Sequence, residues 1–147
     1  MAYKLPATIY NPSQLRSLQR ELKQLKSLRS AQNIVFSENL QELAVTNSVK
    51  KLNTKIVSEM LSFIETLIGD APEVSVSLAS SPGSEDRVEF ISWMRRKIHP
   101  QLMIHFVIRP ELLAGCIVRT AKGVHDWSLK TALETNKEKL TKRLINA

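Results

Sequence analysis

Three side chains near the end of the sequence, His125, Asp126 and Ser128, are of the types that form a catalytic triad. In a triad the histidine must reach both the nucleophile and the acid that orients it. His125 and Asp126 are adjacent, and adjacent residues of a strand point to opposite faces. A turn aspartate and a helix-capping serine explain the same residues, because short polar side chains routinely bind free backbone N–H groups. The spacing therefore favours a structural role, and we expect no enzymatic activity.

The sequence also contains no recognisable pattern for a metal or a cofactor. The three histidines and the single cysteine, Cys116, are not arranged in the CxxC or HxxxH pairs that hold zinc. The turn at 81–84 contains a glycine but lacks the lysine and the further glycines of a phosphate-binding loop. We therefore expect neither a metal nor a cofactor.

The chain is basic, with 21 Lys and Arg residues against 14 Asp and Glu, and a net charge of +7. This charge predicts attraction to nucleic acid, to an anionic membrane surface or to an acidic protein. RNA-binding sheets stack bases on exposed aromatic side chains, but aromatic residues make up only 5% of this chain. A small RNA- or ribosome-associated protein is therefore the second hypothesis, behind a protein-binding role. The single cysteine fits a reducing, cytoplasmic setting, and no apolar run approaches the length that spans a bilayer.

Two tryptophans and two arginines are the candidate partner-binding residues. Trp93 lies off the apolar stripe of its expected helix, and Trp127 lies in a turn. Tryptophan is enriched among the residues that dominate binding energy at interfaces, although packing at the edge of a core explains both positions equally well. Arg95 and Arg96 end the same expected helix as Trp93, where they suit the helix dipole and would steer an acidic partner.

Helical periodicity dominates residues 1–69, the expected N-terminal domain. Asn11 followed by Pro12 predicts a helix start, and Ser37 predicts the cap of a shorter helix. Ser48 is expected to begin a third helix that ends near Gly69 and Pro72. The first helix has a narrow apolar seam of leucines that suits packing on another helix, formed by Leu15, Leu18, Leu22, Leu25 and Leu28.

Residues 70–147 predict a C-terminal βαββα domain with a small mixed sheet, which makes the whole chain α+β. Residues 73–79 alternate as a half-buried strand, and Ser84 is expected to cap a helix that ends in basic residues. Residues 101–108 are apolar on both faces and predict the central strand, and residues 115–120 predict an antiparallel strand. Ser128 is expected to cap a last helix with a buried stripe of Leu129, Leu133, Leu140 and Leu144.

Gly115 lies where the expected strand follows a tight corner, a position that suggests positive φ or close backbone approach.

The stretch PEVSVSLASSP, the helix after it, and LMIHFVIRPELLAGCIVRTAKGVHDWSLKTALETNKEKL together resemble the C-terminal domain of the δ subunit of F-type ATP synthases. The mitochondrial counterpart of that subunit is the oligomycin-sensitivity-conferring protein. The resemblance covers roughly residues 72 to 130, and the order of strands and helices matches.

The family's motif runs through this stretch. Its Gly-Gly step corresponds to Ala114-Gly115, its basic strand residue to Arg119 and its turn glycine to Gly123. Its Asp-Gly-Ser helix entry corresponds to Asp126-Trp127-Ser128. Two positions depart from the family pattern, since Ala114 and Trp127 stand where the family has glycine.

The resemblance implies a non-catalytic peripheral-stalk subunit that ties the α3β3 head of the synthase to its b-type stalk helices. Its partners would be the α, β and b-type subunits, and it would reach the membrane only through them. It would act at the cytoplasmic face of the cell membrane, or on the matrix or stromal side in an organelle. The family's N-terminal domain is a six-helix bundle, so residues 1–69, with about three expected helices, would be a reduced version.

Overall fold

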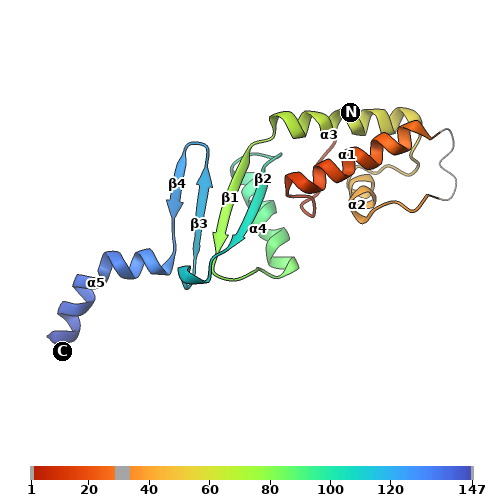
Figure 1. Cartoon of the computed structure of the whole chain (residues 1–147). Coiled ribbons are helices and arrows are strands. Elements are labelled where there is room, and N and C mark those ends of the chain that lie inside the picture. The colour runs from red at the N-terminus through yellow and green to blue at the C-terminus, as the bar shows by residue number, and fades with distance from the viewer. Residues whose placement is uncertain (1, 29–33, 147) are drawn as a thin grey trace. The chain divides into compact units, whose positions relative to one another are not determined.

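The computed structural model describes residues 2–28 and 34–146 (Figure 1). In these residues, helices α1 (Pro12–Ser27), α2 (Glu38–Thr46) and α3 (Thr54–Asp70) come first. They are followed by β1 (Glu73–Leu78), α4 (Ser84–Lys97), β2 (Met103–Ile108), the 3-10 helix η1 (Pro110–Leu112), β3 (Cys116–Thr120), β4 (Gly123–Asp126) and α5 (Leu129–Ile145). The predicted α+β class, with a helix-rich part before a small mixed sheet, is confirmed.

The described residues form two compact units that interleave along the sequence. The first unit comprises Met1–Pro72 together with Glu85–Met103, and the second comprises Glu73–Ser84 together with Ile104–Ala147. Helix α4 is therefore grouped by its contacts with the N-terminal helices, whereas a division of the sequence at residue 69 would group it with the strands.

Helix α1 begins and packs as its sequence predicts. The Asn11 side chain accepts a hydrogen bond from the backbone N–H of Gln14, and the Gln14 side chain accepts one from the backbone N–H of Asn11, which completes a capping box. Four leucines of the predicted seam, Leu15, Leu18, Leu22 and Leu25, are buried, and only Leu28, just beyond the helix, is exposed. Burial of each leucine is worth about 1.5–3 kcal/mol, so this seam dominates the packing of the first unit.

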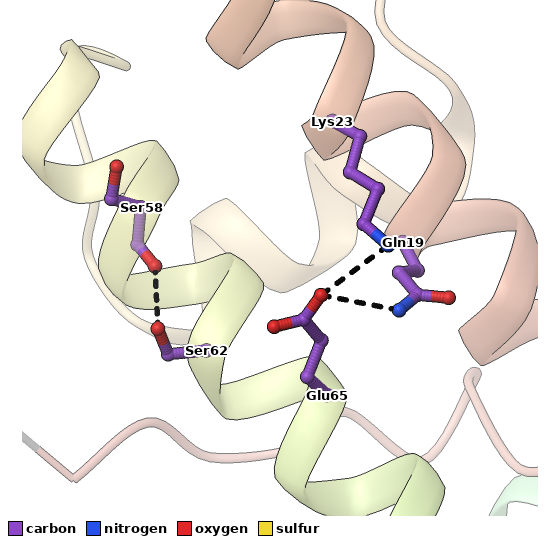
Figure 2. A network of polar contacts seen from close by, with 5 residues as sticks. All are labelled: Gln19, Lys23, Ser58, Ser62 and Glu65. Atoms are coloured by element: carbon purple, nitrogen blue, oxygen red, sulfur yellow. Dashed lines mark hydrogen bonds and ion pairs between the residues drawn. The ribbon is translucent and has the colours of Figure 1, made fainter.

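Helices α1 and α3 lie against each other, and polar side chains border their contact (Figure 2). Lys23 Nζ lies 3.4 Å from Glu65 Oε1, and Gln19 Nε2 donates a hydrogen bond of 3.3 Å to the same oxygen. The two charged side chains are 55% and 45% exposed. Such a surface pair contributes about 1 kcal/mol or less, so the buried leucines rather than this pair hold the two helices together.

Helix α3 begins later than the sequence predicts. Ser37 caps α2 as expected, but the next helix starts at Thr54 with Asn53 as its cap, and Ser48 instead lies in the turn that ends α2. The backbone N–H of Ser48 donates to the carbonyl of Val45 (3.0 Å), and that of Val49 donates to Ala44 (2.9 Å). Ser48 has a φ of +56°, the conformation that ends a helix rather than the extended one that begins it, so no helix starts there.

The sheet has the strand order β2-β1-β3-β4, so the prediction that residues 101–108 form the central strand is wrong. Strand β1 lies inside the sheet, and β2 forms one edge, where His105, Val107 and Ile108 are exposed. Strand β3 runs antiparallel to β1, as predicted for residues 115–120, with Val76 opposite Val118. The turn after Thr120 leads into a further short strand, β4, which pairs antiparallel with β3 and whose four residues are all exposed.

Candidate functional site

The corner between η1 and α5, defined here as residues 109–116 and 126–131, contains most of the motif residues. Gly115 has a φ of +79°, and a β-carbon there would overlap the carbonyl oxygen of Trp127 and lie 3.1 Å from Cα of Ser128. Both properties predicted for Gly115 are therefore present. Two backbone hydrogen bonds close the corner: Trp127 N–H to the carbonyl of Cys116 (2.8 Å), and Leu129 N–H to the carbonyl of Ala114 (2.9 Å). They tie the start of α5 to the start of β3.

Leu113 forms a strained γ-turn at the same corner. Its φ of 67° and ψ of −53° lie outside the regions that L-residues usually adopt, and the N–H of Ala114 donates to the carbonyl of Leu112 at 2.8 Å. The Leu113 side chain is 61% exposed, while Leu112 before it is buried. Strained residues of this kind occur preferentially at functional sites. The sequence gives no sign of this turn, because leucine is not a residue that favours positive φ.

Asp126 and Ser128 both have structural partners at the entry to α5. Ser128, which is almost completely buried, accepts a hydrogen bond from the N–H of Thr131 and so caps the helix as predicted. Asp126 accepts from the backbone N–H of Ser128 (2.9 Å) through one carboxylate oxygen and from the hydroxyl of Thr131 (2.7 Å) through the other. Hydrogen bonds from Ser128, and then from Thr131, lower the pKa of Asp126 below its ordinary value.

The other residues that suggested chemistry lie apart from this carboxylate or in different roles. The ring of His125 stacks on Trp127, with centroids 5.5 Å apart. Burial raises the pKa of the half-buried thiol of Cys116, and Asp126 adds to the effect. In the part of the chain that the structure describes, no group of three or more His, Cys, Asp or Glu residues is placed to hold a metal ion. Arg119 is exposed on β3, in register with Val124 of β4 and with Ser75 of β1.

Arg95 is not the surface charge that was predicted to steer a partner. It is 8% exposed, and its guanidinium donates hydrogen bonds to the carbonyls of Leu102 (3.1 Å), Pro6 (2.9 Å) and Ile9 (2.7 Å), with a longer one to Leu5. Burial lowers the pKa of Arg95 to about 10, so the group remains charged at neutral pH. The side chain thus holds the N-terminal segment and the loop after α4 together within the first unit.

The remaining candidate residues are accessible. Arg96 is exposed next to buried Arg95, Trp93 is 47% exposed on α4, and Trp127 is 63% exposed at the entry to α5. Trp93 and Arg96 belong to the first unit, and Trp127 belongs to the second. Of the predicted site residues, the second unit therefore brings together Gly115, Asp126, Trp127 and Ser128.

Helix α5 does not bury the stripe of leucines that its sequence predicts to be buried. Leu129, Leu133 and Leu140 are 42–44% exposed and Leu144 is 78% exposed, and no residue of the helix is buried. The apolar spacing is real, since at 3.6 residues per turn these four leucines, named here the α5 stripe, span an arc of about 60°. Spacing predicts that a face is apolar, but it does not predict which surface covers that face.

Basic residues border the α5 stripe on both sides. Helix α5 carries five basic and two acidic side chains. Helical spacing places Lys130 and Lys137 along one border and Arg143 along the other. Lys139 and Glu134 lie further from the stripe, on opposite sides of it, and Glu138 lies on the far side of the helix. The exposed surface is thus an apolar strip between two positive borders.

Comparison of the chain with models of known protein families found no match, and comparison with curated proteins found none either. Among the helices that the structure describes, none is both long enough and apolar enough to cross a membrane.

Proposed function

We propose that this chain is a non-catalytic, δ-type peripheral-stalk subunit of an F-type ATP synthase. It links the catalytic α3β3 head to b-type stalk helices during proton-driven ATP synthesis, and it reaches the membrane only through these partners. The observation that carries the proposal is the exposed α5 stripe between two basic borders. The δ-type motif residues at the corner where α5 begins support it further.

The α5 stripe suits a helical partner. Amphipathic helices dock through apolar side chains at helical spacing, and the α5 stripe presents four such leucines over most of the helix length. Exposed Trp127, just before the first turn, adds a side chain of the type that most often dominates binding energy at interfaces. A stalk helix of the b type is a partner of this kind.

The charges around the α5 stripe select between partners. Positive borders repel a second copy of α5, because each border of one copy would face a positive border of the other. A helix with acidic residues beside its apolar face would instead be complementary. We therefore expect the docking face of the b-type helix to be flanked by carboxylates.

The corner explains how a helix with no buried residue of its own can transmit force. Its start is tied to the sheet through Leu129 N–H to Ala114, Trp127 N–H to Cys116 and the buried cap Ser128. A load applied to α5 by a docked stalk helix therefore passes into backbone hydrogen bonds of β3. This rigidity suits a subunit that resists torque.

Affinity purification of the tagged chain from its own organism tests the proposal, with mass spectrometry of the chains that accompany it. We expect the α, β and b-type subunits to co-purify. Leu133→Asp should remove the b-type subunit, whereas the matched α5 variant Glu138→Gln, on the far side of the helix, should retain it. Recovery of ribosomal RNA and ribosomal proteins in place of synthase subunits would contradict the proposal and support the RNA-associated alternative.

A further inference from the structure

The turn between α2 and α3 holds a strained serine at a fixed place in the first unit. Ser48 has a φ of +56° and occupies the position of a Schellman motif where glycine is usual. Asn47 beside it binds the N-terminal segment: its side-chain oxygen accepts from the N–H of Lys4 (2.7 Å), and its amide donates to the carbonyl of Lys4 (3.0 Å). These contacts define the wall of a surface groove.

Two open grooves meet at residues 49–51 within the first unit. The larger has a volume of about 1000 Å³ and is bordered by Lys50, Lys51 and Lys55. The smaller, of about 510 Å³, is largely apolar, with Leu40, Ala44 and Leu52 in its lining. Val49, Lys50 and Lys51 border both grooves. The combined surface, named here the lysine groove, therefore has a positive half and an apolar half.

The lysines of the lysine groove have no ion-pair partner among residues 2–28 and 34–146. All three lysines are exposed. Glu59 is the one acidic residue that lines the larger groove, and its carboxylate accepts a hydrogen bond of 3.0 Å from the hydroxyl of Tyr3. A ligand with several negative charges would therefore find three free cations on one short segment.

The chemistry of the lysine groove favours an acidic peptide over nucleic acid. Base recognition needs accessible aromatic faces, but the Tyr3 ring packs on Phe63 with centroids 5.8 Å apart, and its hydroxyl is engaged by Glu59. Phe36, which lines the smaller groove, is partly buried against the core of the first unit. The apolar half instead suits an aliphatic side chain. Exposed Val45, at 76%, extends that half at the surface.

We propose that the lysine groove is a second docking site, which binds an acidic peptide segment through carboxylates on Lys50, Lys51 and Lys55 and an apolar side chain beside Val49. The site lies in the first unit and is formed by residues separate from the α5 stripe. It does not depend on the stalk function proposed above.

The test is a fluorescence anisotropy titration of the full chain with a labelled twelve-residue peptide of aspartate and glutamate with two central leucines. The variant Lys50→Glu/Lys51→Glu/Lys55→Glu should weaken binding roughly tenfold or more, because three attractive charges become repulsive. The control Arg16→Glu/Arg20→Glu/Lys26→Glu changes the net charge equally on exposed residues of α1 and should weaken binding less than threefold. Replacing the peptide's leucines by serine should also weaken binding several-fold.

Three results would overturn the proposal. Equal losses in the two triple variants would show that the peptide responds only to net charge or binds elsewhere, on α5 for example. Absence of measurable binding by the parent chain would exclude the site. Displacement of the peptide by a twelve-residue oligouridylate at lower concentration than the unlabelled peptide would identify the groove as a nucleic-acid site. Circular dichroism of each variant checks that the fold is retained.

Discussion

The carbonyl oxygen of Trp127 occupies the space that a β-carbon on Gly115 would need. The clash is with backbone, so no side-chain rotation relieves it, and Gly115 also has positive φ. This relationship joins the strand entry at β3 to the helix entry at α5. It explains in physical terms why the corner needs a glycine.

Gly115→Ala should therefore destabilise the protein by more than the ~1 kcal/mol that is typical of point mutations. The measurement is the free energy of unfolding in urea. Gly69→Ala is the matched control, because Gly69 lies inside α3 and a β-carbon there meets open space. That change should leave stability unchanged or raise it by up to about 1 kcal/mol. Equal stabilities for the two variants would refute the close approach at Gly115.

Asp126 should make stability depend on pH in the acid range. Its pKa is lowered in the folded state, so its contribution is fully present above the unfolded value of 3.8 and is lost as the pH falls through the lower folded value. Asp126→Asn should melt at a lower temperature than the parent at neutral pH. The difference between the two melting temperatures should shrink as the pH falls below 3.8. A difference in melting temperature that stays constant from neutral to acid pH would show that the carboxylate charge does not contribute to stability.

Arg95→Ala should destabilise the first unit by more than about 2 kcal/mol, because it removes the side-chain donor from the buried carbonyls of Leu102 and Ile9. Arg96→Ala, at the neighbouring exposed position, serves as the control and should stay within about 0.5 kcal/mol of the parent. Thermal melts of the two variants provide the comparison. If both variants melt at the same temperature as the parent, the hydrogen bonds of Arg95 do not contribute to stability.

Ser48→Gly should stabilise the protein by about 0.5–1 kcal/mol, since glycine adopts positive φ without the steric penalty that serine bears. Ser58→Gly, the same exchange in the interior of α3, should instead destabilise by about 0.5 kcal/mol. Urea denaturation of both variants measures the contrast. Destabilisation by both would mean that the left-handed conformation of Ser48 is not a source of strain.

Local signals in the sequence predict the entries of α1, α2 and α5 correctly, whereas Ser84, expected to cap α4, is the first residue of that helix. The caps at Asn11, Ser37 and Ser128 and the seam from Leu15 to Leu25 depend on residues three or four positions apart, and all are confirmed. The expected helix start at Ser48 is wrong. Serine is a common cap residue, and the sequence alone does not show that this serine has positive φ and ends the preceding helix.

Features that depend on distant residues could not be predicted in the same way. The edge position of β2 follows from which strands pair, not from its own apolar pattern. The burial of Arg95 depends on carbonyls about 90 positions earlier in the chain. The exposure of the α5 stripe depends on the absence of a covering surface among the described residues, and its leucine spacing carries no information about that.

The central claim is that α5 docks a b-type stalk helix. The most direct test is a titration of the full chain with the C-terminal helix of the b-type subunit from the same organism. Trp127→Ala and Leu133→Asp should each weaken binding by about 30-fold, which corresponds to the ~2 kcal/mol threshold of an interface hot spot. Glu138→Gln, on the far side of α5, should bind like the parent, and raising the salt concentration should slow association. Unchanged affinity in both the Trp127→Ala and the Leu133→Asp variants, with their fold retained, would contradict the docking of a b-type helix on α5.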